Sequence, residues 1–400
     1  MSPTSSVKSI QCHGCSIVLR QIEGPEASEL FFTCQPTAGS EPADQAAAAW
    51  RAILEVLQSK GGKYSDVITE TYFLRNVSRD LPAVRKARAR ALARGGVSPH
   101  RSAIMEVEQP PLNGQHAVEI LIYAVVAADA PIRLNIHNTQ ARCDCPECAL
   151  MHATLVRVGE EIRLCAGNIY GAGETAFEQT THMFEVAENL LQQAGMEFSD
   201  VMRTWIYFPE MERDYAQFNR ARRQFFESRG IDPVPASTGI GAGLTAPEHN
   251  VCLGIYAVKS VPPTKRIVMT TPTLNEAPEY GSDFSRGMRV QEANKVSLLV
   301  SGTAGLDETG ATICIGDLEG QARRMLLNVE SLLKGQGANF SDVVSAITYL
   351  KHPEDAYRLK EIFHETGYDG FPNVLVAAEV CRAELLCETE LLAVPSAMRT

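Results

Sequence analysis

The sequence predicts an α+β fold made of three tandem domains, each with the element order ββαβαββ. The first observation is a seven-residue stretch that occurs three times, as Gly61–Val67, Gly195–Val201 and Gly337–Val343. The second is its surroundings, because each copy follows an amphipathic helix pattern and precedes a strand pattern with an aromatic residue near its end. A motif that recurs at domain-sized intervals with the same neighbours indicates copies of one domain. Two helices would then cover one face of each sheet.

The composition of the repeated stretch has a physical explanation. Its glycine stands where a helix must stop, at a left-handed position where a Cβ atom is costly. The aromatic residue is expected to pack back on the helix end. The Ser-Asp pair suits the turn that directs the chain into the next strand.

The first domain is expected to span residues 1–130 and to contain all elements of the repeat. Its first helix is predicted to begin near Asp44, which is a plausible N-cap. Trp50 lies on the apolar stripe of that helix. The remaining elements are predicted as strands at 16–20, 30–34, 67–74, 101–107 and 118–125, and a basic helix near 81–94.

The other two domains are expected at 156–259 and 266–400. A cysteine-rich segment, 131–155, would connect the first domain to the second. Residues 260–265 contain two adjacent prolines and are predicted to be a linker. The third domain is predicted to begin with an irregular arm and to continue through strands at 296–301, 343–350, 374–380 and 385–394.

Composition excludes several classes of protein. The fractions of hydrophobic and charged residues, 45% and 21%, are those of an ordinary globular chain. A net charge of −11 argues against a nucleic-acid partner. The longest apolar runs are too short to span a membrane. The N-terminus has no apolar segment of the signal-peptide kind, and 11 cysteines is an odd number, so a cytoplasmic protein with reduced thiols is expected.

The third domain carries the clearest family features. These are Ser301-Gly302-Thr303, a helix with Gln321 and Asn328, the repeated stretch, and Tyr349-Leu350. Together they resemble the RidA (YjgF, L-PSP) family, whose members are homotrimers with a small-molecule site at each subunit interface. Three copies in one chain therefore imply a pseudo-trimeric monomer with three chemically different interfaces. Whether two such chains form a homodimer is left open.

A narrower resemblance links the second and third domains to chorismatases, which are two RidA-like domains in one chain. It rests on the arm from Pro278 to Arg286, on Ser301–Ala304, and on the segment from Cys381 to Glu390. In the second domain, Arg203-x-Trp205-x-Tyr207 and residues 235–241 are similar to the other chorismatase domain. Chorismatases hydrolyse the enol ether of chorismate and release pyruvate. The resemblance implies that this chain acts on a small carboxylated molecule.

The first candidate site combines Arg382 with Glu388 and Glu390. A guanidinium group can hold a carboxylate bidentately, and a nearby carboxylic acid can protonate a vinyl group. One residue separates Glu388 from Glu390, so on a strand both side chains point to the same face. Two carboxyl groups that lie close together there can raise the pKa of one of them. A solvated strand pair is the alternative explanation. The chorismatase resemblance implies Glu388 as the proton donor, Tyr207 and Arg203 as groups from the second domain, and Ser301, Thr238 and Cys381 as substrate-binding residues.

The second candidate site is Arg101 with Glu119 in the first domain. In RidA proteins the arginine of Pro-x-Arg-[Ser/Thr] binds the substrate carboxylate, and residues 99–102 match that motif. The resemblance implies an imine-hydrolysing site at one interface. An interface salt bridge explains the two residues equally well.

The third candidate site is a structural zinc ion bound by Cys12, Cys15, Cys145 and Cys148. The two Cys-x-x-Cys pairs each place two sulfurs on one turn, as tetrahedral zinc requires. Four thiolates leave no open coordination position, so the metal would not be catalytic. Cys143 and His152 are possible replacement ligands, and unrelated reduced thiols are the alternative. No organic cofactor is expected.

These observations lead to three functional hypotheses. The first is a chorismatase-like hydrolase of a small unsaturated carboxylate, with its site between the second and third domains. The second is a RidA-type enamine or imine deaminase that uses Arg101 and Glu119. The third is a catalytically silent protein that binds a small ligand.

Overall fold

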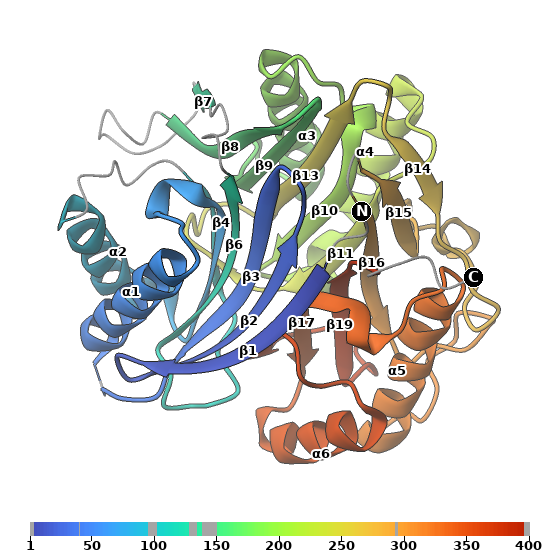
Figure 1. Ribbon diagram of the computed structural model, residues 1–400. Helices are drawn as coiled ribbons and strands as arrows, with labels where there is room; N and C mark the ends of the chain where they lie inside the picture. Colours follow the sequence, from blue (N-terminus) through green and yellow to red (C-terminus); the bar gives the residue numbers. More distant parts are fainter. Residues whose placement is uncertain are drawn as a thin grey trace.

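The chain folds into three α+β domains that surround a common centre, with the sheets inside and the helices outside (Figure 1). The computed structural model describes residues 4–39, 41–94, 102–127, 134–137, 150–292 and 295–395. Each domain contains the order ββαβαββ, so the predicted fold and the pseudo-trimer are confirmed. Arg101, Cys145 and Cys148 lie outside the described residues.

Domain 1 has the sheet order β1-β2-β3-β6-β4-β5, extended at its end by the short strand β12 of domain 2. Two helices cover the outer face of this sheet (Figure 1). Its elements are β1 (Thr4–Cys12), β2 (Cys15–Glu23), β3 (Ala27–Pro36), α1 (Pro42–Ser59), β4 (Val67–Leu74), α2 (Val77–Arg94), β5 (Ala103–Glu108) and β6 (Val118–Ala127).

Domains 2 and 3 repeat this arrangement. The elements of domain 2 are β7 (Leu134–His137), β8 (Leu150–Val158), β9 (Glu161–Ile169), α3 (Ala176–Gln193), β10 (Val201–Phe208), α4 (Met211–Arg229), β11 (Ala236–Gly241), β12 (Gly243–Leu244) and β13 (Cys252–Ser260). Those of domain 3 are β14 (Lys265–Val268), β15 (Gly287–Gln291), β16 (Val296–Ala304), α5 (Leu318–Lys334), β17 (Val343–Leu350), α6 (Ala356–Thr366), β18 (Asn373–Ala377) and β19 (Cys387–Ala393).

Each domain has one edge strand more than the sequence analysis expected. β1, β7 and β14 each pair antiparallel with the first strand of the repeat. β7 and the start of β8 come from residues 131–155, which were expected only to connect two domains. β14 begins at Lys265, in what was expected to be a linker. Edge strands are often short or polar, because one side pairs with nothing, and their sequence pattern is correspondingly weak.

The repeated seven-residue stretch forms the same turn three times. Gly61, Gly195 and Gly337 have φ angles of 71°, 69° and 71°, which is the left-handed conformation expected after a helix. Each stretch then makes one 3₁₀ turn before the central strand. In each turn the aspartate accepts a hydrogen bond, of 2.8–3.0 Å, from the backbone N–H three residues earlier. The three copies of the motif therefore share one turn geometry.

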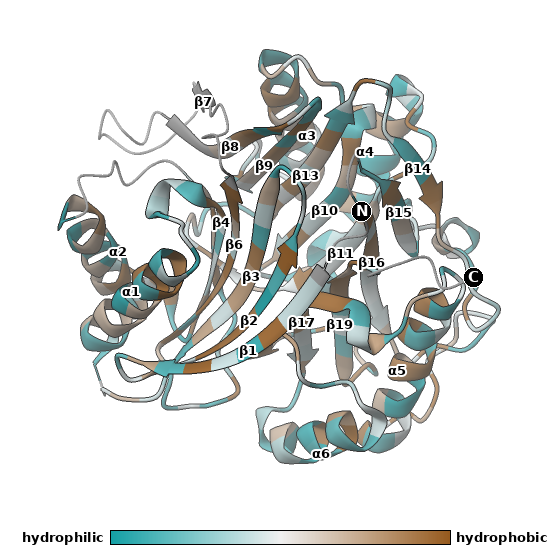
Figure 2. Cartoon of the chain, viewed as in Figure 1, coloured by the Kyte–Doolittle hydropathy of each residue, from teal (hydrophilic) through white to brown (hydrophobic). Residues whose placement is uncertain are grey.

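The hydrophobic interior consists of one core per domain and a shared centre. Trp50 is fully buried between the sheet and helices of domain 1, and Phe184 occupies the corresponding place in domain 2. Residues of all three sheets pack together on the inner faces, including Phe73, Tyr207 and Tyr349. Figure 2 shows both hydrophilic and hydrophobic residues along the helices, whereas β13 is mostly hydrophobic. Burial between sheets thus joins the domains.

A buried network of charges also joins the three domains. Arg163 of domain 2 lies 2.8 Å from Glu29 of domain 1 and 2.8 Å from Glu292, which precedes β16 of domain 3. The ammonium group of Lys295 lies 2.6 Å from Glu29. Each domain contributes at least one charged side chain to this network. Separating any one domain from the other two would therefore take away a partner of a buried charge, which is unfavourable.

Of the helices in the described part of the chain, none combines the length and the apolar composition needed to cross a membrane.

Candidate active site

A pocket of about 470 Å³ lies between domains 2 and 3. Its walls come from α4 and β11 of domain 2, and from the arm before β15, β16 and the segment leading into β19 of domain 3. The arm is held against domain 2 by the bridge between Ala236 and Ser285. The lining residues include Arg222, Arg286, Gly302, Cys381, Arg382 and Glu388.

Glu388 is the buried acidic group of the pocket, whose lining also includes the exposed Glu212. It stands on β19 directly opposite Tyr349 of β17, and only 4% of its surface is exposed. Burial, and after it the charge of Glu390, raise the pKa of its carboxyl group to about 8. Arg203 and Arg286 oppose this shift. The result is a carboxylic acid that keeps its proton at neutral pH.

Gly302 on β16 provides the space for the carboxyl group of Glu388. A Cβ atom at position 302 would lie 2.0 Å from Oε1 of Glu388 and 3.0 Å from Cγ2 of Thr238. The backbone N–H of Gly302 donates to Oγ1 of Thr238 at 2.9 Å. A side chain at position 302 and this position of Glu388 are therefore mutually exclusive.

Two arginines of domain 3 line the pocket with Glu388. The Arg382 Nη1 group donates to the carbonyl oxygen of Gly310 at 2.7 Å. The Arg286 Nε group donates to the carbonyl oxygen of Asn275 at 2.8 Å, and its side chain is 2% exposed. These bonds fix the direction of both guanidinium groups, so that they are oriented before a ligand arrives.

A third arginine comes from domain 2. Arg222 on α4 lies over the rings of Phe218 and Phe284, with its guanidinium carbon 4.9 and 5.9 Å from the two ring centres. Its Nη2 group donates to Oδ1 of Asn219 at 2.7 Å. The pocket thus receives positive charge from both of its domains.

Arg203 and Glu390 form an ion pair beside the pocket. Nη2 of Arg203 lies 2.6 Å from Oε2 of Glu390, and it also donates to Oγ1 of Thr238 at 2.5 Å. The indole N–H of Trp205 donates to the other oxygen of Glu390 at 2.7 Å. Arg203, Glu390 and Tyr207 line a central cavity and not the pocket of Glu388. Of the two predicted acidic residues, Glu388 therefore lines the pocket between domains 2 and 3, and Glu390 lines the central cavity.

The substrate-binding residues expected from the sequence take different places. Cys381 lines the pocket, and burial raises the pKa of its thiol to about 12, so it is not a thiolate at neutral pH. The hydroxyl of Ser301 donates to the carbonyl oxygen of Ser285 at 2.5 Å and accepts from the Ser237 N–H at 2.9 Å. Ser301 and Thr238 thus hold the two domains together at the edge of the site.

In domain 1, Glu119 lies away from this pocket. It stands opposite Phe73 on the neighbouring strand, the position that corresponds to Glu388 opposite Tyr349. Its carboxylate interacts with Gln35 at 2.9 Å and with His116 at 2.7 Å. Its predicted partner Arg101 is outside the described residues, so the predicted pair stays a prediction.

The predicted zinc ligands of the N-terminus lie on a β-hairpin. Cys12 and Cys15 face each other across a two-residue turn in which His13 and Gly14 have positive φ angles. A hydrogen bond with Cys34 lowers the pKa of the Cys15 thiol. Within the described residues no three His, Cys, Asp or Glu side chains gather as metal ligands do. Since Cys145 and Cys148 are not described, the structural zinc site stays a prediction.

Sequence reasoning did not assign a role to Arg222, Arg286 or Gly302. Arg286 and Gly302 belong to motifs that carried the family resemblance, and that was the available signal for them. Arg222 is one of several arginines on α4, and its sequence neighbours do not distinguish it. Its role depends on α4 lying against the arm of domain 3.

Known proteins resemble this chain in sequence and in fold. A family model described as Endoribonuclease L-PSP matches residues 162–259 and 275–394, together more than half of the chain. A 3-hydroxybenzoate synthase of Streptomyces hygroscopicus is 28% identical over 260 residues, covering 58% of this chain and 73% of that protein. A RutC family protein of Pyrococcus abyssi is 28% identical over 131 residues, covering 32% of this chain and 96% of that protein.

Among solved structures, a crystal structure of a chorismatase has a TM-score of 0.60 to this chain at 16% identity. The likeness covers 82% of this chain and 93% of the chorismatase chain. This likeness shows that the two chains share a fold. The family model matches parts of domains 2 and 3 in sequence.

Proposed function

Because the chain belongs to the endoribonuclease L-PSP (RidA) family, we propose that it is a chorismatase-like hydrolase with its active site in the pocket between domains 2 and 3. The observation that carries the proposal is Glu388, a buried carboxylic acid with a pKa of about 8 in a pocket that three arginines also line. An acid that is protonated at neutral pH can donate a proton, and fixed cations can hold an anionic substrate.

The pocket fits a small molecule with more than one carboxylate. Its volume of about 470 Å³ is within the usual range of ligand sites. Arg222, Arg286 and Arg382 line the pocket, and Glu388 is neutral below about pH 8, so the three cations outnumber the other acidic residue of the lining, Glu212. Chorismate has two carboxylates and an enol ether, and relatives of this chain are named a chorismatase and a 3-hydroxybenzoate synthase. We therefore infer a chorismate-like substrate.

The reaction would begin with proton transfer from Glu388 to the terminal methylene carbon of the enol ether. The adjacent carbon then carries positive charge, shared with the ether oxygen, and one water molecule adds to it. In the resulting hemiketal, the bond between this carbon and the ether oxygen breaks. This yields pyruvate and an alcohol on the ring, and a proton returns to Glu388. General acid catalysis of this kind contributes about 10²–10⁴-fold to the rate.

The arginines would bind the substrate and leave Glu388 protonated. A cation next to a carboxyl group favours its ionised form, so an arginine aimed at Glu388 would remove the acid that the reaction needs. Arg382 and Arg286 are instead held by carbonyl oxygens of Gly310 and Asn275. Guanidinium groups are suited to recognise carboxylates, so Arg382 and Arg286 are the expected substrate-binding groups of domain 3.

Solvent deuterium tests the proposed proton transfer. Hydrolysis of chorismate in D₂O should give pyruvate with one deuterium in its methyl group, and immediate reduction to lactate preserves this label for mass spectrometry. Glu388→Gln should form this product at least about 10²-fold more slowly. Pyruvate formed without deuterium, or at an unchanged rate by the variant, would refute the role of Glu388.

A RidA-type deaminase site in domain 1 is the second hypothesis. The observation that favours it is the equivalent placement of Glu119 and Glu388 opposite Phe73 and Tyr349. Ammonia release from a 2-imino acid that is lost in Glu119→Gln but retained in Glu388→Gln would support it. Binding of chorismate without turnover of either substrate would instead support a silent ligand-binding protein.

A further inference from the structure

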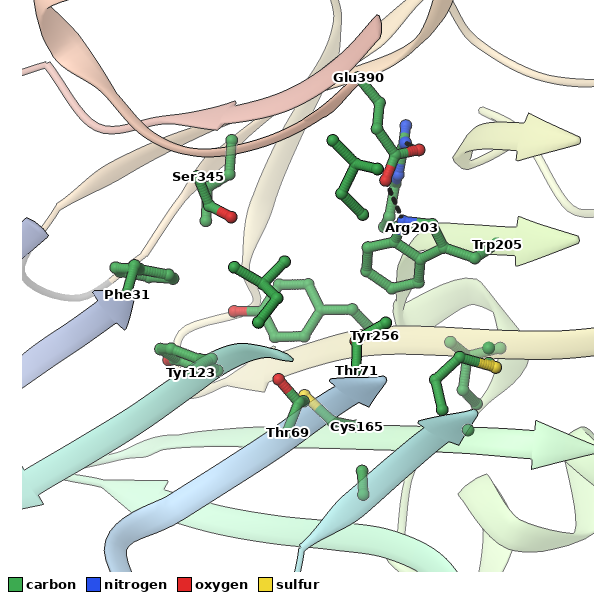
Figure 3. Close-up of a pocket in the computed structure, with 18 of the residues that line it drawn as sticks. Phe31, Thr69, Thr71, Tyr123, Cys165, Arg203, Trp205, Tyr256, Ser345 and Glu390 are labelled. Carbon is green, nitrogen blue, oxygen red and sulfur yellow. Dashed lines mark hydrogen bonds and ion pairs between the residues drawn. The ribbon is translucent and has the colours of Figure 1, made fainter. Parts of the chain in front are cut away.

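A cavity of about 160 Å³ lies at the centre of the molecule, where the three sheets meet (Figure 3). Thr71 on β4, Trp205 on β10 and Ser345 on β17 lie on its wall, so each domain contributes to it. Most of the other lining residues are apolar or aromatic. An engineered apolar cavity of about 150 Å³ is large enough to bind benzene. The central cavity can therefore hold one molecule of about that size.

One polar group on the cavity wall is not satisfied within the described part of the chain. Arg203 is 3% exposed, and its Nη2 group donates hydrogen bonds to Glu390 and Thr238. Its Nη1 atom has no hydrogen-bond partner among the residues that the structure describes. A buried N–H group without an acceptor carries the full cost of its desolvation. An acceptor oxygen on a bound molecule would remove that cost.

The charges on the cavity wall are already paired. Arg203 lies 2.6 Å from Glu390, and Lys295 lies 2.6 Å from Glu29. The carboxylate of Glu70 lies 2.7 Å from Arg88. A carboxylate brought into this space would be an additional buried charge near Glu390, which is unfavourable. A neutral ligand fits the electrostatics better.

The aromatic side chains define the shape of the ligand. The indole of Trp205 lies on the wall beside Arg203, whose guanidinium carbon is 5.4 Å from the indole ring centre (Figure 3). Flat rings pack well against such a surface. We propose that the central cavity binds a neutral monocyclic aromatic molecule with one acceptor oxygen, which Nη1 of Arg203 holds. This site is separate from the pocket of Glu388 and does not depend on its activity.

Calorimetric titration of the full chain with phenol, toluene and benzoate tests the ligand class. Phenol and toluene have the same number of heavy atoms, and only phenol has an acceptor oxygen. Phenol should bind about tenfold more tightly than toluene, because a hydrogen bond to a charged donor contributes that much. Benzoate should bind more weakly than phenol. Equal binding of phenol and toluene, tighter binding of benzoate, or no binding of phenol would overturn the proposal.

Variants that fill the cavity test its location. Thr71→Phe and Ser345→Leu enlarge side chains on opposite walls, and either folded variant should weaken phenol binding at least about tenfold. The two changes are in different domains, so one remains informative where the other fails to fold. Arg382→Ala, in the pocket of Glu388, is the control and should bind phenol as the wild type does. Unchanged binding in the filled variants, or its loss in Arg382→Ala, would place phenol elsewhere.

Discussion

At Glu388, burial and the charge of Glu390 act in the same direction, and they raise the pKa of the carboxyl group to about 8. A general acid works only while it holds its proton. We therefore expect kcat for pyruvate release to be constant at neutral pH and to fall about tenfold per pH unit above about 8. In Glu388→Gln this pH dependence should disappear together with most of the activity.

The matched control for that profile is Glu379→Gln. Glu379 has 68% of its side chain exposed and lies near Lys351 at 3.4 Å. The variant removes one carboxylate from the same domain without touching the pocket, and it should keep both the rate and the pH profile of the wild type. A wild-type profile without a decrease above pH 8 would show that another group donates the proton.

The same pKa shift predicts a pH-dependent cost in stability. The folded-state pKa of Glu388, about 8, is above the ordinary glutamate value of 4.5, so its contribution to stability is fully present below pH 4.5 and is lost as the pH rises through 8. Glu388→Gln has no such loss. Its melting temperature should equal that of the wild type near pH 4 and exceed it at pH 9. A difference of equal size at both pH values would contradict the shift.

Part of the site could be predicted at the residue scale, and part could not. Arg382 and Glu388 are six residues apart in one motif, so the family pattern pointed to both. Arg222 reaches the same pocket from α4 of another domain, and no local pattern predicts which face of that helix meets the arm. Glu390 was expected close enough to Glu388 to raise its pKa, and it does so. The ion pair of Glu390 with Arg203 on the wall of the central cavity was not predicted.

At the element scale, β16 positions the acid through the absence of a side chain. An alanine at position 302 would bring Cβ to 2.0 Å from Oε1 of Glu388, so the carboxyl group must move. Gly302→Ala should lower kcat at least about tenfold, because small displacements of catalytic groups are costly. Gly114→Ala is the control, since a Cβ there has open space. Steady-state kinetics of both variants measure the effect, and full activity in Gly302→Ala would disprove it.

The regularity of the elements explains which of them the sequence predicted. The amphipathic helices and the inner strands have clear periodicity, and the repeated stretch marks the boundary between α1 and β4, α3 and β10, and α5 and β17. β1 is mainly polar and β14 is short, and both form strands because they pair with the edge of a neighbouring strand. That pairing depends on the tertiary fold, so the sequence of the edge strand itself does not predict it.

At the scale of the whole molecule, the buried charges at the centre couple the stability of the three domains. Burial opposes ionisation of Glu29, but Arg163 and Lys295 outweigh it and lower its pKa to about 2. The stabilisation is present above pH 4.5 and is lost as the pH falls toward 2. Lys295→Met removes one cation, so the variant should unfold at a higher pH than the wild type during acid titration, in a single transition.

The control for that titration is Lys334→Met. Lys334 pairs with Glu330 one turn away on α5 and has 63% of its side chain exposed, so the loss should be about 0.3–0.5 kcal/mol. Removing one partner of a buried pair typically costs about 3–5 kcal/mol. Equal acid midpoints in the two variants would contradict the central role of the network. Separate transitions for the three domains would contradict their coupling.

The pseudo-trimer itself could be predicted because the repeated stretch occurs at domain-sized intervals. Which of its interfaces holds the candidate active site could not be predicted, because this depends on side chains that two domains bring together at each contact. At the contact between domains 2 and 3, the structure combines the buried acid Glu388 with three arginines in one pocket.

Pyruvate release from chorismate tests the central proposal most directly. The full chain is incubated with chorismate at pH 7, and pyruvate is measured continuously by coupled reduction to lactate, with Glu388→Gln and Glu379→Gln assayed in parallel. We expect pyruvate formation by the wild type and Glu379→Gln, and a rate about 10²–10⁴-fold lower in Glu388→Gln. No pyruvate from the wild-type protein, or equal rates in all three proteins, would contradict it.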